Sequence, residues 1–218
     1  MTVPVAEIAQ QRTVRLIPTA YYKPPVLSAL ADNDNELAIL ERLEGLTCRR
    51  LQTPPILPDY DAWGRSFIEA AFKYRRKGGC RFNDESRGAW YAGFSDRTSL
   101  TEVAYHHTRE LEYMGHLYDK VQYRALHASF IGRFNDLRGA AADDPCLHPD
   151  VSVGYPAGQG VARQLMDDGS RGLIYPSVRD PGGICIVAFQ PNVVQDVTPG
   201  ANWRLEWDGS PEWRASAA

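Results

Sequence analysis

The segment from Gly78 to Glu102 constrains the fold of this chain more than any other part of it. The glycine pair Gly78-Gly79 opens the segment. It should end the helix predicted just before it, because glycine readily adopts the backbone conformation that closes helices. Residues 89–94 then alternate as a strand, and residues 99–118 place apolar side chains at helical spacing. A strand enclosed by two helices predicts an α+β domain.

Upstream, the sequence predicts two helices, one over residues 36–46 capped by Asn35 and one over residues 63–74. Three prolines in TPPILPDYD (residues 53–61) predict an extended connector between them. We therefore expect residues 1–77 to form a helical N-terminal extension packed on the core.

Downstream, residues 78–200 are predicted to form the main domain. We expect strands over residues 123–134, 172–175, 184–189 and 193–197. A Pro-, Gly- and Asp-rich loop over residues 140–160 should lead to a short helix carrying Val161 and Leu165. Residues 201–218 are expected to be a C-terminal tail, and its last residues, SPEWRASAA (210–218), are expected to be frayed.

Composition excludes several classes of protein. A net charge of −3 offers no basic face for nucleic acid, and no apolar run approaches the ~20 residues of a membrane span. The N-terminus lacks the layout of a secretory signal. Cys48, Cys80, Cys146 and Cys185 are far apart without a CxxC pair, so we expect reduced thiols in a cytoplasmic protein and no zinc site.

Arg81 and Tyr91 are candidate binding residues with ordinary alternatives. Arg81 follows the glycine pair, where a ligand can approach closely, and its planar guanidinium suits phosphate oxygens. Its local sequence alone favours a surface arginine. Tyr91 shares a strand face with Ala89 and Gly93, which leaves room for a flat ring to stack on it. An ordinary strand tyrosine would have the same neighbours.

Glu102 also has two interpretations. The residues from Ser99 to Glu102 fit a capping box, in which the glutamate bonds the backbone N–H of the cap residue. Alternatively, the carboxylate is displayed at the start of a helix beside the strand of Tyr91. Both interpretations hold if the first turn faces a cleft.

Ser177 lies in YPSVRDPGG, where its hydroxyl could donate to a ligand or stabilise the turn. No GxSxG motif surrounds it, which argues against a hydrolase nucleophile. His106 and His107 adjoin on the predicted helix, and His107 falls on its apolar stripe. We interpret it as a core histidine with a hydrogen-bond partner rather than a metal ligand. Neither GxGxxG nor a P-loop motif occurs.

At these residues the chain resembles the RES-domain family, the toxins of bacterial RES–Xre toxin–antitoxin modules. The arginine, glutamate and serine that name the family match Arg81 in GGCRFN, Glu102 in TSLTEVAYHH and Ser177 in YPSVRDPGG. The family's tyrosine matches Tyr91 in GAWYAG. The resemblance covers about residues 78–197, and RLIPTAYYKPP with the 63–74 helix looks like the longer members. Cys80 departs from the commoner glycine before the arginine.

The resemblance implies a single domain similar to the diphtheria-toxin-like ADP-ribosyltransferase fold, with split antiparallel sheets and flanking helices. It also implies an enzyme that consumes NAD+ as substrate without a metal, passing ADP-ribose to water, phosphate or a protein acceptor. Glu102 would stabilise the oxocarbenium-like ribose, and Arg81 would clamp the pyrophosphate. Tyr91 would stack on the nicotinamide or its ribose, and Ser177 would fix an amide or phosphate oxygen.

An Xre-family antitoxin that occludes the active site is the partner implied by the resemblance, in a homodimer or a hetero-oligomer with the antitoxin. We expect no direct contact with nucleic acid and no membrane. Two other functions stay open. One is a non-catalytic module that binds a dinucleotide or a protein, and the other is a ribonuclease-type toxin, which the acidic balance disfavours.

Overall fold

The computed structural model describes residues 3–9, 12–21, 30–33, 35–36, 39–40, 43, 63–141 and 143–218. Nine strands in these residues form one sheet in the order β1-β5-β6-β7-β3-β2-β4-β8-β9. They are β1 (Val5–Ile8), β2 (Thr13–Pro18), β3 (Trp90–Gly93), β4 (Tyr118–Ser129), β5 (Gly132–Asp136), β6 (Gly172–Pro176), β7 (Ile184–Ala188), β8 (Gln195–Asp208) and β9 (Trp213–Ala217).

Three helices with described bounds pack on this sheet: α2 (Arg65–Lys73), α3 (Asp96–Met114) and α4 (Val151–Asp167). The predicted α+β class and single domain are confirmed. The predicted helix over residues 36–46 lies mostly, and the connector over 53–61 entirely, outside the described residues. No helix in the described part of the chain is long and apolar enough to cross a membrane.

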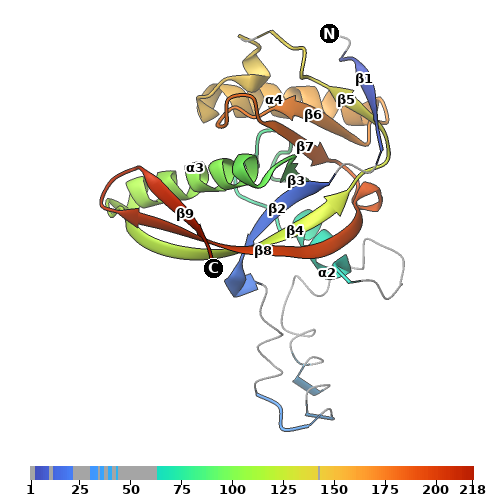
Figure 1. Ribbon diagram of the computed structural model, residues 1–218. Helices are drawn as coiled ribbons and strands as arrows, with labels where there is room; N and C mark the ends of the chain where they lie inside the picture. Colours follow the sequence, from blue (N-terminus) through green and yellow to red (C-terminus); the bar gives the residue numbers. More distant parts are fainter. Residues whose placement is uncertain are drawn as a thin grey trace.

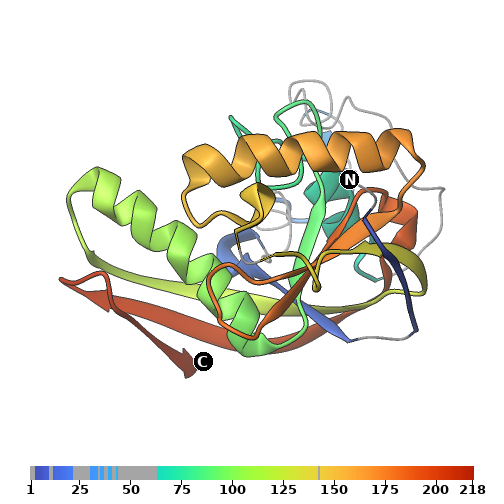
Figure 2. The ribbon, with the colours of Figure 1, turned by 90° about the horizontal axis from the view of Figure 1, so that it is seen from above.

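Helices cover both faces of the sheet, as the alternation along β7 shows. Val187 belongs to a core cluster with Leu165 of α4, whereas Ile186 belongs to another with Ile68 of α2. A third cluster, which includes Leu205 of β8, lies under α3. Figures 1 and 2 show α4 (light orange) along β6 and β7 and α3 (green) along β4 and β8. Because α3 and α4 lie on the same face of the sheet, the middle strands of the sheet form the bottom of the space between these two helices.

The sheet nearly divides between β2 and β3, which share the single register pair Val14–Gly93. Ser99 at the start of α3 joins the strands there. Its hydroxyl donates to the Val14 carbonyl at 2.7 Å and accepts the Gly93 N–H at 3.2 Å. Arg15 adds a hydrogen bond from its Nη1 to the Tyr91 carbonyl oxygen at 3.1 Å. The strands therefore form one mixed sheet, in which β5 and β6 are parallel, rather than two antiparallel sheets.

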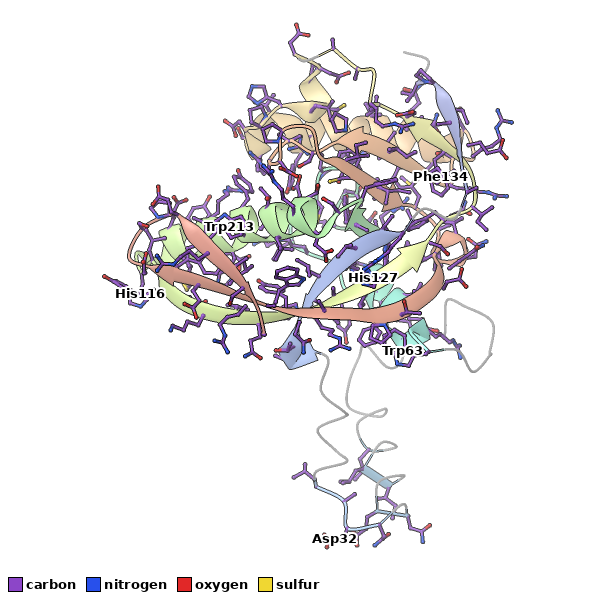
Figure 3. All side chains as sticks on the ribbon, in the orientation of Figure 1. Asp32, Trp63, His116, His127, Phe134 and Trp213 are labelled. Carbon is purple, nitrogen blue, oxygen red and sulfur yellow. The ribbon has the colours of Figure 1, made fainter. Side chains whose placement is uncertain are left out.

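Described segments near both ends of the chain, β1 and β9, are part of this sheet. The helical extension predicted for residues 1–77 is wrong for residues 5–18, because β1 pairs with β5 and β2 lies between β3 and β4. The C-terminal tail predicted for residues 201–218, with fraying over 210–218, is also wrong. The second half of β8 pairs with β4 and with β9, and Trp213 of β9, labelled in Figure 3, packs against the cluster under α3.

Three predicted boundaries also move. The predicted strand over 123–134 is two strands, because β4 ends at Ser129 and β5 begins after it. Phe134, labelled in Figure 3, meets Phe130 edge to face in the core. The predicted loop over 140–160 contains the first half of α4, since Asp150 caps a helix there by accepting the Ser152 N–H at 2.8 Å. This helix contains Pro156. The third boundary, the start of α3, bears on the site.

Candidate active site

A cavity of about 250 Å³ opens where β2 and β3 separate, between α3 and α4. Arg81, Tyr91 and Glu102 all line it, although they come from a loop, a strand and a helix. Ser177 reaches the same site by a hydrogen bond to Glu102. The structure thus brings together all four residues singled out in the sequence.

Arg81 is a buried residue with 7% of its surface exposed, so its interpretation as a surface arginine is wrong. Its Nη1 donates to the carbonyl oxygens of Cys146 at 2.8 Å and His148 at 3.0 Å. Within the described part of the chain, neither Nε nor Nη2 forms a hydrogen bond. Those two nitrogens remain as charged donors for a ligand, while Nη1 fixes the orientation of the group.

Two glycines on one face of α4 make room for Arg81. A Cβ atom on Gly154 would lie 2.5 Å from Arg81 Nη1 and 2.4 Å from the His148 carbonyl oxygen. A Cβ atom on Gly158 would lie 2.4 Å from the Arg81 carbonyl oxygen. The helix therefore approaches the Arg81 backbone and guanidinium more closely than any residue with a side chain would allow.

Tyr91 supports the same loop from β3. Its hydroxyl accepts the Phe82 N–H at 2.9 Å and donates to Asn83 Oδ1 at 2.8 Å. Burial raises the pKa of the Tyr91 phenol well above its ordinary value, so the hydroxyl stays protonated and can make both bonds. The hydroxyl of Tyr91 thus holds the turn next to Arg81, while the residue forms part of the cavity wall.

Glu102 is not a helix cap, because α3 begins at Asp96 with Ser95 as its N-cap. The Ser95 hydroxyl accepts the Thr98 N–H at 3.1 Å, which places Glu102 in the second turn of the helix. Its Oε1 accepts a hydrogen bond of 2.6 Å from the Ser177 hydroxyl. The Cys185 sulfur lies 3.9 Å from the same oxygen. The carboxylate is therefore part of the cavity wall rather than of the helix terminus.

Three further arginines line the cavity: Arg15 from β2, Arg76 from the segment after α2, and Arg179 from the segment after β6. Burial lowers the pKa of Arg15 to about 10, which leaves it charged at neutral pH. The guanidinium carbon of Arg179 lies 3.4 Å from the ring centroid of Tyr105. Among the described lining residues, Glu102 is the one carboxylate beside four guanidinium groups. The cavity is consequently suited to an anion.

His106 lies one turn after Glu102 on α3 and also lines the cavity. Its Nε2 is 3.4 Å from the Tyr155 hydroxyl. Burial, reinforced by the neighbouring arginines, lowers the pKa of His106 to about 4, so its imidazole is neutral. His107 instead has its Nε2 2.6 Å from Asp119 Oδ2, outside the cavity. The predicted hydrogen-bond partner of His107 is confirmed, whereas its predicted place in the core is not, because the residue is only half-buried.

The described His, Cys, Asp and Glu side chains were the sequence-based candidates for metal ligands, and the cysteines for disulfides. No group of three or more His, Cys, Asp or Glu side chains in the described residues could hold a metal ion. Cys80, Cys146 and Cys185 are free thiols, and burial raises the pKa of each. Cys48 lies outside the described residues.

Sequence reasoning missed several of the lining residues, including all three further arginines. Arg179 stands two positions after Ser177 in the quoted motif, and His106 follows Glu102 by four positions, so both could have been found by local spacing. Tyr155 lies in a segment predicted to be a loop. Arg15 has no local signal, because β2 reaches the site through pairing with strands far along the chain.

Comparison with known proteins identifies the family of this chain. Residues 57–208 match the RES domain, so the match extends on both sides of the segment predicted from the motifs. The chain is also similar to "Uncharacterized protein y4oC" of Sinorhizobium fredii (strain NBRC 101917 / NGR234), with 27% identity over 205 residues, which cover 90% of this chain and 83% of that protein. The domain match spans most of the chain and contains the whole Arg81–Tyr91–Glu102–Ser177 constellation, and the chain therefore belongs to the RES-domain family.

Proposed function

We propose that this protein is the toxin of a toxin–antitoxin module and cleaves the nicotinamide–ribose bond of NAD+. One observation carries the proposal: among the described residues that line the cavity, Glu102 is the single carboxylate and the charged groups around it are four arginines. NAD+ has the complementary pattern, since its pyrophosphate is anionic and its pyridinium ring is cationic. A guanidinium binds phosphate oxygens as a charged fork, and a carboxylate stabilises a nearby cation.

The size of the cavity supports binding of the reacting half of the dinucleotide. Ligand pockets usually measure about 300–1,000 Å³. At about 250 Å³ this one suits the nicotinamide ribose and the adjacent phosphates, with the adenosine directed outward. Arg81 would hold the pyrophosphate through Nε and Nη2, and the Tyr91 ring would stack on the nicotinamide or its ribose.

Bond cleavage in this site needs no general acid, because nicotinamide leaves as a neutral molecule. The C1′–N bond breaks, its electron pair passes to the pyridinium nitrogen, and an oxocarbenium-like ribose remains. Glu102 stabilises this cation and accepts a hydrogen bond from a ribose hydroxyl, which strengthens in such transition states. An acceptor oxygen then bonds to C1′ and releases its proton to solvent.

The test is incubation of the purified protein with NAD+, followed by separate measurement of nicotinamide, free ADP-ribose, ADP-ribose 1″-phosphate in phosphate buffer, and protein-bound ADP-ribose. We expect nicotinamide release, and the distribution of ADP-ribose identifies the acceptor as water, phosphate or protein. Glu102→Gln should reduce the rate by about 10²–10³-fold, the usual effect of removing a group that stabilises transition-state charge. Unchanged NAD+ with the wild-type protein would refute the proposal, and RNA cleavage in a parallel assay would favour the ribonuclease alternative.

The proposed partner is an Xre-family antitoxin that occupies the same cavity. A carboxylate from the antitoxin, such as its chain terminus, could pair with Arg81 in place of the substrate phosphate. Competing ligands weaken each other reciprocally, so saturating ADP-ribose should reduce antitoxin affinity. Equal antitoxin affinity with and without ADP-ribose would place the antitoxin elsewhere on the protein.

A further inference from the structure

Every hydrogen-bonding position of the Ser177 hydroxyl is occupied. The O–H donates to Glu102 Oε1 at 2.6 Å, and the oxygen accepts the N–H groups of Asp180 at 2.9 Å and Arg179 at 3.2 Å. A serine hydroxyl has one donor and two acceptor lone pairs, so none remains for a substrate amide or phosphate. The residue is also buried, with 9% of its surface exposed.

The bond from Ser177 restrains the carboxylate of Glu102. A glutamate side chain has three rotatable bonds, and a short charge-assisted hydrogen bond selects among their conformations. The two backbone N–H groups that donate to the Ser177 oxygen polarise its O–H bond, and this strengthens the hydrogen bond that the hydroxyl donates to the Glu102 carboxylate. Within the described part of the chain, Oε2 forms no hydrogen bond and remains for the ribose hydroxyl.

Asp180 attaches this turn to the helix that carries Glu102. Its Oδ2 accepts the Thr98 hydroxyl at 2.8 Å, and its Oδ1 lies 3.1 Å from Arg97 Nε. Thr98 stands one turn before Glu102 on α3, so it lies on the same helix face. With 5% of its surface exposed, Asp180 is one of the few buried charged residues of the described chain. A continuous hydrogen-bond network thus connects Thr98 to Glu102 through Asp180 and Ser177.

We propose that Ser177 and Asp180 are positioning residues that act through Glu102, and that Ser177 does not contact the substrate. This inference rests on the proposed function, because Glu102 is the group that would stabilise the ribose cation. The anchored turn fixes Oε1 from outside the cavity and leaves Oε2 to the substrate. Loss of either residue should therefore affect the chemical step and spare substrate binding.

The experiment compares Ser177→Ala and Asp180→Asn with Ser170→Ala. Ser170 is a matched control, because it is also a turn serine but lies before β6, whereas Ser177 follows that strand. Nicotinamide release would provide kcat and KM for NAD+, and calorimetry would provide the Kd of ADP-ribose. Circular dichroism would establish that each variant is folded.

For Ser177→Ala we expect kcat to fall by about 10²-fold, the effect of misplacing a catalytic group by ~1 Å, with KM and the ADP-ribose Kd within about twofold of wild type. Asp180→Asn should lower kcat by about tenfold, since it weakens the attachment of the turn to α3 but keeps the Ser177 hydroxyl. Ser170→Ala should have the kcat and KM of the wild type.

An increase in KM or in the ADP-ribose Kd with kcat unchanged would return Ser177 to the substrate-binding residues and overturn the inference. Wild-type kinetics in both variants would overturn it as well. If Ser177→Ala does not fold, the same readouts on Asp180→Asn decide between these outcomes. A wild-type protein that releases no nicotinamide contradicts the proposed function instead, so the two failures are distinguishable.

Discussion

Gly154→Ala should disable the site by displacing Arg81. The new methyl carbon would lie 2.5 Å from Arg81 Nη1 and 2.4 Å from the His148 carbonyl oxygen, which accepts a hydrogen bond from that nitrogen. Ordinary contacts of this kind begin at 3.4 Å, so the guanidinium or the helix must move by about 1 Å. A misplacement of ~1 Å can lower a rate by 10²-fold, which corresponds to about 2.7 kcal/mol of lost transition-state stabilisation.

Stability should change less than activity in this variant. Replacing a helical glycine by alanine contributes about 1 kcal/mol, whereas overpacking costs about 1–3 kcal/mol. The net loss in the free energy of unfolding is therefore ~0–2 kcal/mol, which urea denaturation can measure. The variant should remain folded while kcat/KM for nicotinamide release falls.

Gly160→Ala is the control, because it lies on the same helix and a Cβ atom there meets nothing within 4 Å. It should gain up to ~1 kcal/mol of stability and keep wild-type kinetics. A Gly154→Ala enzyme with kcat/KM close to that of Gly160→Ala would refute the reasoning. It would mean either that α4 yields without moving Arg81 or that the position of Arg81 does not matter.

Three other perturbations test neighbouring parts of the site. Arg81→Lys should weaken ADP-ribose binding by about 10–100-fold in a calorimetric titration, because an ammonium keeps the charge but lacks the fork, and an unchanged Kd would remove Arg81 from the site. Tyr91→Phe leaves the Phe82 N–H without its partner and should lower the free energy of unfolding by about 1–3 kcal/mol in urea denaturation, whereas a neutral result would mean that water replaces the hydroxyl. Folding depresses the pKa of His106 from 6.5 to about 4, so the unfolded chain binds the proton first as pH falls. Stability should be full above pH ~6.5 and decrease by about 3 kcal/mol toward pH 4, and His106→Gln should remove that part of the dependence; equal pH profiles would contradict it.

Some of the helices and strands, and the four candidate site residues, could be read from the sequence because their signals are local. The apolar stripe of α3 and the strand of Tyr91 follow from side-chain periodicity, which each segment contains in full. Arg81, Glu102 and Ser177 were recognised in short motifs. The choice between their structural and functional interpretations still required the fold, since the capping box at Ser99 fits the sequence as well as the true cap at Ser95 does.

Pairing between segments far apart in the sequence decided which strands join the sheet and where each one lies in it. A strand is stabilised by its neighbours in the sheet rather than by its own residues, so β2 at the centre and the β8–β9 hairpin at the edge have no complete local signal. The same pairing delivers Arg15 to the cavity. Packing likewise decided that the first half of α4 is helical. Its glycines weaken the helix in isolation but permit its close approach to Arg81. The residue types that could perform the chemistry are therefore written in the sequence, whereas their arrangement around one cavity depends on contacts between distant segments.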